Sequence, residues 1–342
     1  MSFALFITCI ILIAAVLIFT VVTVVVSKIK LKRALKPVEY YPPRGYSPID
    51  VQLKYYSRAA NPHALFNPLM LYWAENGFIT IEEDCKRGLK LTKLKAIEPN
   101  KHAADDVACG RNYRAEKTLF DEMFSRGPVF YTLAAESTYE TVHEKFMKSC
   151  KSNSKKVNSP LSKKLTIATA ISSVAVLIIV TLICGLTVRS PLFVAMVFPI
   201  VAVVACKFMP NELFLKYPFL AVWGGAPFGA VVGFGPPDCA VLLGCAVAVA
   251  FINVNVLSYF IDFRSDEDVA VYGRICAFKT FLLEAESDRL ETLVEENPAY
   301  FYDVLPYCYI LKITDKLKPK FDKITLDGPS WYLGDMRDTL MF

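Results

Sequence analysis

The chain has 342 residues, of which 54% are hydrophobic and only 21% are charged. The apolar residues gather in runs too long for a soluble core, which excludes a purely soluble protein and predicts an α-helical integral membrane protein. The net charge of +5 is uneven, because residues 28–164 hold 25 basic and 15 acidic residues whereas residues 261–342 hold 10 and 16.

The chain opens with an apolar run at residues 4–26. As a helix this run can cross about 30 Å of hydrocarbon. Basic residues follow it and none precedes it, which is the reverse of a secretory signal peptide. Because positive charge stays in the cytoplasm, we expect an uncleaved anchor with its N-terminus outside.

Residues 37–151 form a predicted cytoplasmic module that begins with two helices. Ser47 and Asp50 supply a cap and an early acid around a proline, which is typical of a helix start. The Asn76-Gly77 pair ends the second helix.

A hairpin follows these helices, because residues 78–83 and 89–95 alternate in polarity as paired strands do. Two more helices are expected at 114–126 and 137–151, and the polar segment 152–164 is a predicted linker to the bilayer. Helix, helix and hairpin in this order are the outline of a winged helix, so the module is predicted to be winged-helix-like and α+β.

A winged helix raises the question of DNA binding. A recognition helix carries basic or amide side chains, and neighbouring basic groups bind phosphate. Residues 59–84 contain no Lys or Arg, and the basic residues lie in the predicted wing at 86–95. We therefore expect a surface that faces protein or membrane and consider nucleic acid an unlikely partner.

Residues 165–260 form a predicted membrane block with almost no charge. Four crossings return the chain to the side from which it entered, so with the anchor we expect about five transmembrane helices. Both 37–164 and 261–342 are then cytoplasmic, where the basic and the acidic module can meet. The predicted spans are 165–188, 192–206, 217–235 and 237–260, of which 192–206 is the shortest and could be re-entrant.

Glycine and proline gather at residues 224–238. Broken helices of this composition line the binding sites of transporters. Small residues also allow close helix packing, and a charged residue expected in an ion-coupled carrier is not evident within the span. Packing is the favoured interpretation, and the residues of the predicted break are Gly224, Gly225, Pro227, Pro236, Pro237 and Asp238.

Residues 261–342 are predicted to form an all-helical cytoplasmic module. A cap at Ser265 starts a helix that runs to about residue 283, and further helices are expected at 284–296, after Asn297-Pro298 and near 316–323. A proline–aromatic ending follows. The predicted interaction residues are Pro306, Tyr307, Trp331 and Tyr332.

Catalytic and metal-binding patterns are missing from the sequence. No G-x-S-x-G, P-loop, H-E-x-x-H or G-x-G-x-x-G string occurs. The ten cysteines form no C-x-x-C pair, and none of the three histidines has a second histidine three or four residues away. We therefore expect no catalytic residue, cofactor or metal ligand and lean against an enzyme.

Several strings together carry a family resemblance. EYYPPRGYS at 39–47 and NGFITIEE at 76–83 resemble the YciQ-like predicted bacterial membrane proteins, which contain a domain of unknown function (DUF2207). FKTFLLEAESDRL at 278–290 and the Ser-Trp-Tyr ending at 330–332 are similar to the same family. The resemblance implies a winged-helix-like module, a membrane region and a helical C-terminal part, but no reaction. It also implies an extracytoplasmic domain before the anchor, whereas this sequence starts at the anchor.

The favoured function is a non-enzymatic scaffold or interaction protein of the cell membrane. It would present its two cytoplasmic modules to a protein partner at the inner face of the bilayer. One alternative is a transporter or channel component that uses residues 224–238. Another is a membrane-tethered DNA-binding regulator.

Overall fold

The computed structural model describes residues 2–33, 38–57, 61–84, 86–97, 113–132, 144, 159–188, 197–208, 218–219, 222–223, 229, 236–322, 324 and 328–333. The chain divides into two compact units, each built from two separate parts of the sequence. Unit 1 contains residues 1–30 and 158–264, and unit 2 contains residues 31–157 and 265–342.

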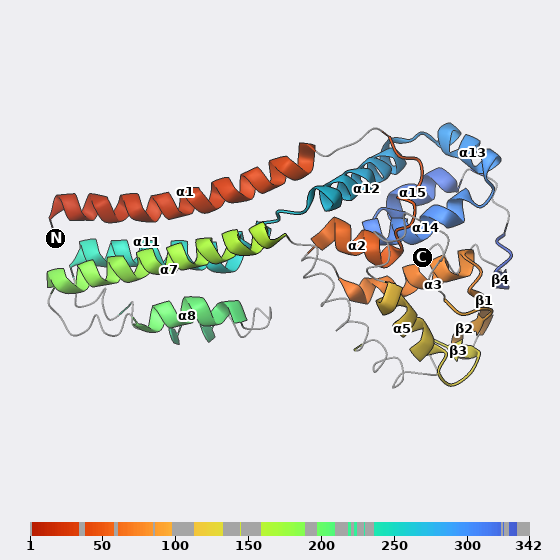
Figure 1. The fold of residues 1–342 in the computed structure, drawn as a ribbon, viewed down its shortest axis with the longest axis horizontal. Helices are drawn as coiled ribbons and strands as arrows, with labels where there is room; N and C mark the ends of the chain where they lie inside the picture. Colours follow the sequence, from red (N-terminus) through yellow and green to blue (C-terminus); the bar gives the residue numbers. More distant parts are fainter. Residues whose placement is uncertain are drawn as a thin grey trace. The chain divides into compact units, whose positions relative to one another are not determined.

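Unit 1 is a set of apolar helices, of which α7 (Pro160–Val188) and α11 (Pro237–Phe251) lie side by side (Figure 1). A π-helical turn, η5 (Ile252–Val256), and a 3-10 turn, η6 (Leu257–Phe260), continue α11. The long N-terminal helix α1 (Phe3–Arg33) and the shorter α8 (Val197–Phe208) complete the described part. Their buried side chains share one apolar core.

Three helical segments in the described part of the chain are long and apolar enough to cross a membrane: Phe3–Arg33, Pro160–Thr187 and Pro237–Phe260. The prediction of a helical membrane protein is therefore confirmed. The count of five stays a prediction, because the span at 217–235 lies largely outside the described residues. The span at 192–206 is described only from Val197 onward, as α8.

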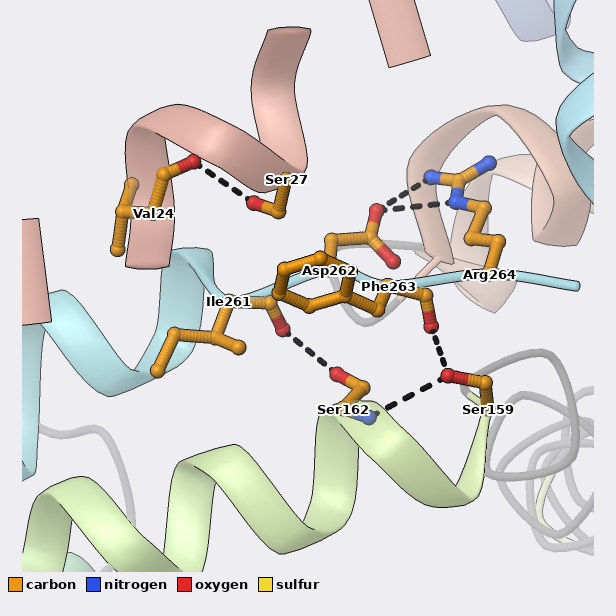
Figure 2. A network of polar contacts seen from close by, with 8 residues as sticks. All are labelled: Val24, Ser27, Ser159, Ser162, Ile261, Asp262, Phe263 and Arg264. Atoms are coloured by element: carbon orange, nitrogen blue, oxygen red, sulfur yellow. Dashed lines mark hydrogen bonds and ion pairs between the residues drawn. The ribbon is translucent and has the colours of Figure 1, made fainter. Parts of the chain in front are cut away.

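Serine side chains tie the start of α7 to the backbone that follows η6 (Figure 2). The Ser159 hydroxyl donates to the carbonyl of Phe263 at 2.7 Å, and the Ser162 hydroxyl donates to the carbonyl of Ile261 at 2.9 Å. Ser159 Oγ also accepts from the backbone N–H of Ser162, so α7 begins about five residues earlier than the sequence predicts. The N-terminal end of α7 and the C-terminal end of η6 therefore lie next to each other.

The first half of unit 2 follows the predicted helix–helix–hairpin order. Its helices are α2 (Pro48–Tyr56) and α3 (Phe66–Glu75), with the 3-10 turn η2 (Pro62–Leu65) between them. The hairpin strands β1 (Ile79–Asp84) and β2 (Gly88–Lys93) pair antiparallel, with Ile79 opposite Lys93. The helix α5 (Tyr113–Met123) is present near its predicted place, whereas the helix expected at 137–151 lies outside the described residues apart from Glu144.

The sheet has two strands that the sequence does not predict. Its order is β3-β2-β1-β4, in which β3 (Val129–Tyr131) is antiparallel to β2. The strand β4 (Tyr332–Leu333) comes from the C-terminal segment and pairs parallel with β1, where Ile81 faces Tyr332. The sheet therefore contains strands from both halves of unit 2.

The described second half of unit 2 is helical apart from β4, so the prediction of an all-helical module at 261–342 is wrong at its C-terminal end, where the chain adds a strand to the sheet. This half contains α12 (Asp266–Glu284), α13 (Ser287–Glu296), α14 (Tyr300–Leu311) and α15 (Thr314–Phe321). Ser265 caps α12 by accepting from the N–H of Asp268 at 3.1 Å. All four starts lie within three residues of the predicted ones.

One apolar core joins the two halves of unit 2, with α14 packed against α2 and α3. A buried ion pair between Lys54 of α2 and Asp268 of α12 crosses this core. A second, half-buried pair joins Glu39 and Arg274 at 2.9 Å. Because burying a charge is costly, the complete burial of Lys54 and Asp268 ties α2 and α12 to one arrangement.

Candidate binding site

A pocket with a volume of about 370 Å³ lies in unit 2 and is lined by three parts of the chain. These are the linker before α2, the C-terminal end of α3 and the first half of α14. We call it the tyrosine pocket, because five tyrosines line it together with three prolines and two carboxylates. Its residues are Tyr41, Pro42, Pro43, Arg44, Gly45, Tyr46, Tyr72, Glu75, Asn76, Tyr302, Asp303, Pro306 and Tyr307.

The linker wall depends on a tight turn. The backbone N–H of Tyr46 donates to the carbonyl of Pro43 at 3.3 Å, and Gly45 between them has a φ of 78°. A residue with a side chain is strained at such a φ, whereas glycine adopts it readily. The turn thereby places aromatic residues on both of its sides at the pocket.

The α3 wall ends at the predicted Asn76-Gly77 stop. The N–H of Phe78 returns to the carbonyl of Trp73 at 2.8 Å, and Gly77 has a φ of 67°. The Asn76 side chain donates to the carbonyl of Tyr72 at 2.7 Å. These bonds fix the last turn of α3, which carries Tyr72 and Glu75 into the pocket.

The α14 wall is joined to the linker through Tyr307. Its buried hydroxyl donates to the carbonyl of Tyr46 at 2.8 Å, and its ring meets that of Tyr72 edge-on at 6.4 Å. Burial raises the pKa of Tyr307 well above its ordinary value. Pro306 has no N–H to donate to the carbonyl of Tyr302, so the helical hydrogen-bond pattern is interrupted beside the pocket.

Two carboxylates face this aromatic enclosure, and each accepts a hydrogen bond from a neutral donor. The indole N–H of Trp331 donates to Glu75 Oε2 at 2.6 Å, and the side-chain amide of Asn297 donates to Asp303 Oδ2 at 3.0 Å. Burial raises the pKa of Glu75, as does the charge of Asp303, while the Trp331 bond lowers it. Burial likewise raises the pKa of Asp303, against the effect of Asn297.

Arg44 is the basic residue of the pocket lining, and its side chain is exposed. Within the described part of the chain, no ion pair joins Arg44 to Glu75 or Asp303. The raised pKa values of both acids agree with this, because a nearby guanidinium would lower them. The pocket thus holds two carboxylates that no cation of the described chain neutralises.

The predicted interaction residues lie in or near this pocket. Pro306 and Tyr307 line it. Trp331 and Tyr332 are buried behind it, where Trp331 meets the ring of Tyr302 edge-on at 5.9 Å and binds Glu75. Their role toward a partner stays a prediction.

The predicted span break lies elsewhere, in unit 1. Gly224, Gly225 and Pro227 fall outside the described residues. Pro236 and Pro237 start α11, and Asp238 is exposed in its first turn. The break itself therefore stays a prediction.

Sequence reasoning missed Glu75 and Asp303, although each carried a signal. Both are single acids within strongly apolar stretches, LMLYWAEN and FYDVLPY. An acid in such a stretch needs either solvent or a partner, because burying its charge is costly. Within the described residues, no group of three or more His, Cys, Asp and Glu could hold a metal ion.

The fold and the pocket define a helical membrane protein with an α+β unit that carries a cavity. The model of the family "Predicted membrane protein (DUF2207) C-terminal domain" matches residues 37–321, so the chain belongs to this family. No curated protein and no solved structure matches the chain.

Proposed function

We propose that this protein binds a partner polypeptide at the tyrosine pocket and holds it at the membrane without catalysing a reaction. The observation that carries the proposal is the pocket itself. It is concave, and five tyrosines line it beside a few polar groups, a combination found in binding sites. Tyrosine is also enriched where one protein binds another, because its ring buries a large area and its hydroxyl bonds.

The scaffold role includes the two modules of the sequence prediction, 37–151 and 261–342, of which the first is proposed to be winged-helix-like. Their shared apolar core supports a role in which they act as one binding body. The helix–helix–hairpin order of α2, α3, β1 and β2 supports the winged-helix assignment.

We further propose five spans in the cell membrane of a bacterium, with the N-terminus outside and unit 2 in the cytoplasm. One observation supports an even number of crossings between residues 158 and 264, and another supports the cytoplasmic side. Both halves of unit 2 share one core, so they lie on the same side of the bilayer. The basic residues after the first apolar run favour the cytoplasmic side.

A photo-crosslinking amino acid placed at Tyr41 tests the binding function in cells. Tyr41 lines the pocket and its side chain is 38% exposed. The matched control is the same substitution at Leu333, which is 56% exposed in unit 2 and does not line the pocket. We expect a defined protein adduct from Tyr41 that re-forms between the purified partner and the purified full chain. The same adducts from both positions, or none from Tyr41, would refute the proposal.

A transporter or channel component is the alternative, and one observation in unit 1 favours it. The π-helical turn η5 carries Asn253 and Asn255, whose buried Oδ1 atoms have no hydrogen-bond partner within the described residues. Such turns occur often at functional sites. This function is tested by measuring solute flux into vesicles that contain the full chain or its Asn253→Leu variant. If empty vesicles show the same flux as those with the full chain, the transporter function is refuted.

A further inference from the structure

We propose that the tyrosine pocket receives the guanidinium group of an arginine side chain of the partner, between Glu75 and Asp303. This inference rests on the proposed binding function and adds the chemical class of the bound group. It follows from the charge, the aromatic lining and the size of the pocket.

Charge is the first argument. Glu75 and Asp303 each accept one hydrogen bond from a neutral donor, which orients the carboxylate but leaves its charge uncompensated. Arg44 at the exposed rim makes no ion pair with either acid within the described residues. A positive charge beside a half-buried carboxylate stabilises its ionised form, so the pocket suits a cationic group.

The aromatic lining is the second argument. Cations are attracted to the faces of tyrosine rings, and a guanidinium also stacks on them because it is planar. The enclosure contains Tyr41, Tyr46, Tyr72, Tyr302 and Tyr307. The shared lining of five tyrosines and two acids therefore offers a flat cation both ring contacts and carboxylate contacts.

The geometry of a guanidinium favours it over a lysine ammonium. A guanidinium presents five N–H donors in a fixed fork and can bond two carboxylates at once, whereas an ammonium acts as a compact, strongly hydrated charge. The cavity of about 370 Å³ lies at the small end of the range for ligand sites, about 300–1,000 Å³. It suits one long side chain and a little of its backbone rather than a whole folded element.

Two probes of equal shape and different charge provide the test. The purified full chain in detergent is titrated with N-acetyl-arginine amide and, separately, with N-acetyl-citrulline amide, in which a neutral urea replaces the guanidinium. We expect saturable binding of the arginine probe and at least about tenfold weaker binding of the citrulline probe. Equal binding of both probes, or no binding of the arginine probe, overturns the inference.

Matched variants connect the binding to the two acids. Glu75→Gln and Asp303→Asn keep an oxygen acceptor for Trp331 and Asn297, and each should weaken arginine binding by about tenfold or more. Glu295→Gln, at an exposed acid of α13 outside the pocket, should leave it unchanged. An equal loss in all three variants, or no loss in the first two, contradicts the assignment.

Unfolding measurements separate loss of the site from loss of the fold. Because burial raises the pKa of Glu75 and Asp303, their neutral amide variants should unfold at the same or a higher temperature at neutral pH. The inference and the proposed function also fail separately. If Tyr41 crosslinks a protein but both probes bind equally, the binding function holds and the guanidinium inference fails. If the arginine probe binds more tightly but Tyr41 gives no adduct, the guanidinium inference holds and the polypeptide partner is refuted.

Discussion

Glu116 of α5 gives the sharpest test of the unit 2 core. Its carboxylate is buried and accepts the indole N–H of Trp73 at 2.8 Å. Burial raises the pKa of Glu116 from 4.5 to about 7, and the charge of Asp50 adds to this, while hydrogen bonds from Trp73 and Ser47 lower it. The folded chain therefore holds this proton at pH values where the unfolded chain has lost it.

The sign and size of the effect follow from linkage. A raised pKa means that the stabilising contribution is complete below pH 4.5 and is lost as the pH rises to about 7. At about 1.4 kcal/mol per pH unit, the loss amounts to about 3 kcal/mol. Glu116→Gln keeps an oxygen acceptor for Trp73 and removes the titration, so above pH 7 the variant should be more stable by up to that amount.

Thermal unfolding of the full chain in detergent measures this difference across the pH range. Trp73 touches the carboxylate and, as one of the three tryptophans of the chain, contributes to the fluorescence that follows unfolding. A stability gain of about 3 kcal/mol should raise the unfolding temperature by on the order of 10 °C above pH 7. The difference should disappear below pH 4.5. Glu122→Gln on the same helix is the control. A difference in unfolding temperature between Glu116→Gln and wild type that stays the same at every pH would refute the reasoning.

Three further outcomes test other contacts. Lys54→Met should destabilise unit 2 by about 3–5 kcal/mol in chemical unfolding, because it leaves Asp268 buried without its partner, and adding Asp268→Leu should restore much of the loss. Asn253→Leu should cost about 0.6 kcal/mol in mixed-micelle unfolding, Ser173→Ala at least as much, and the double variant less than their sum. Both variants remove the 3.1 Å hydrogen bond between the two side chains, and Ser173→Ala also removes the bond to the carbonyl of Thr169. Arg44→Gln should tighten binding of N-acetyl-arginine amide by a few-fold in calorimetry, because it removes a like charge from the pocket rim.

Local sequence patterns predicted the elements of unit 2 closely, because those elements depend on short-range interactions. Ser47 and Ser265 mark the starts of α2 and α12, and the Asn76-Gly77 pair marks the end of α3. The alternation of polarity likewise predicts β1 and β2. In each case the cause lies within a few residues of its effect.

The missed features all depend on contacts across long stretches of sequence. The strand β4 has only two residues and exists because it pairs with β1, some 250 residues earlier in the chain. Asp303 becomes a site residue only when α14 places it beside Glu75. The π-helical turn η5 has no local signal in the sequence, because INVNV fits an ordinary helix equally well.

The side of the membrane on which residues 207–216 lie can decide the number of crossings between residues 158 and 264. Ser159 bonds the carbonyl of Phe263 and Ser162 that of Ile261, so the start of α7 and the end of η6 lie together, which supports the proposed even number of crossings between them (Figure 2). The segments Pro160–Thr187 and Pro237–Phe260 are long and apolar enough to supply two. The 12 described residues of α8 cover about 18 Å as a helix, and roughly 30 Å of hydrocarbon needs about 20 residues.

If the chain crosses the membrane four times between residues 158 and 264, the segment 207–216 lies on the same side as unit 2. If it crosses only twice, the segment lies on the opposite side. With four, a cysteine in 207–216 should react with an impermeant maleimide only under conditions that also label Leu333→Cys in unit 2. With two, it should react together with Ser2→Cys at the end of α1 that we propose lies outside. The wild-type chain, with its ten cysteines, sets the background for both. Labelling together with Ser2→Cys would reduce the proposed five spans to three and make α8 a re-entrant segment on the outer face.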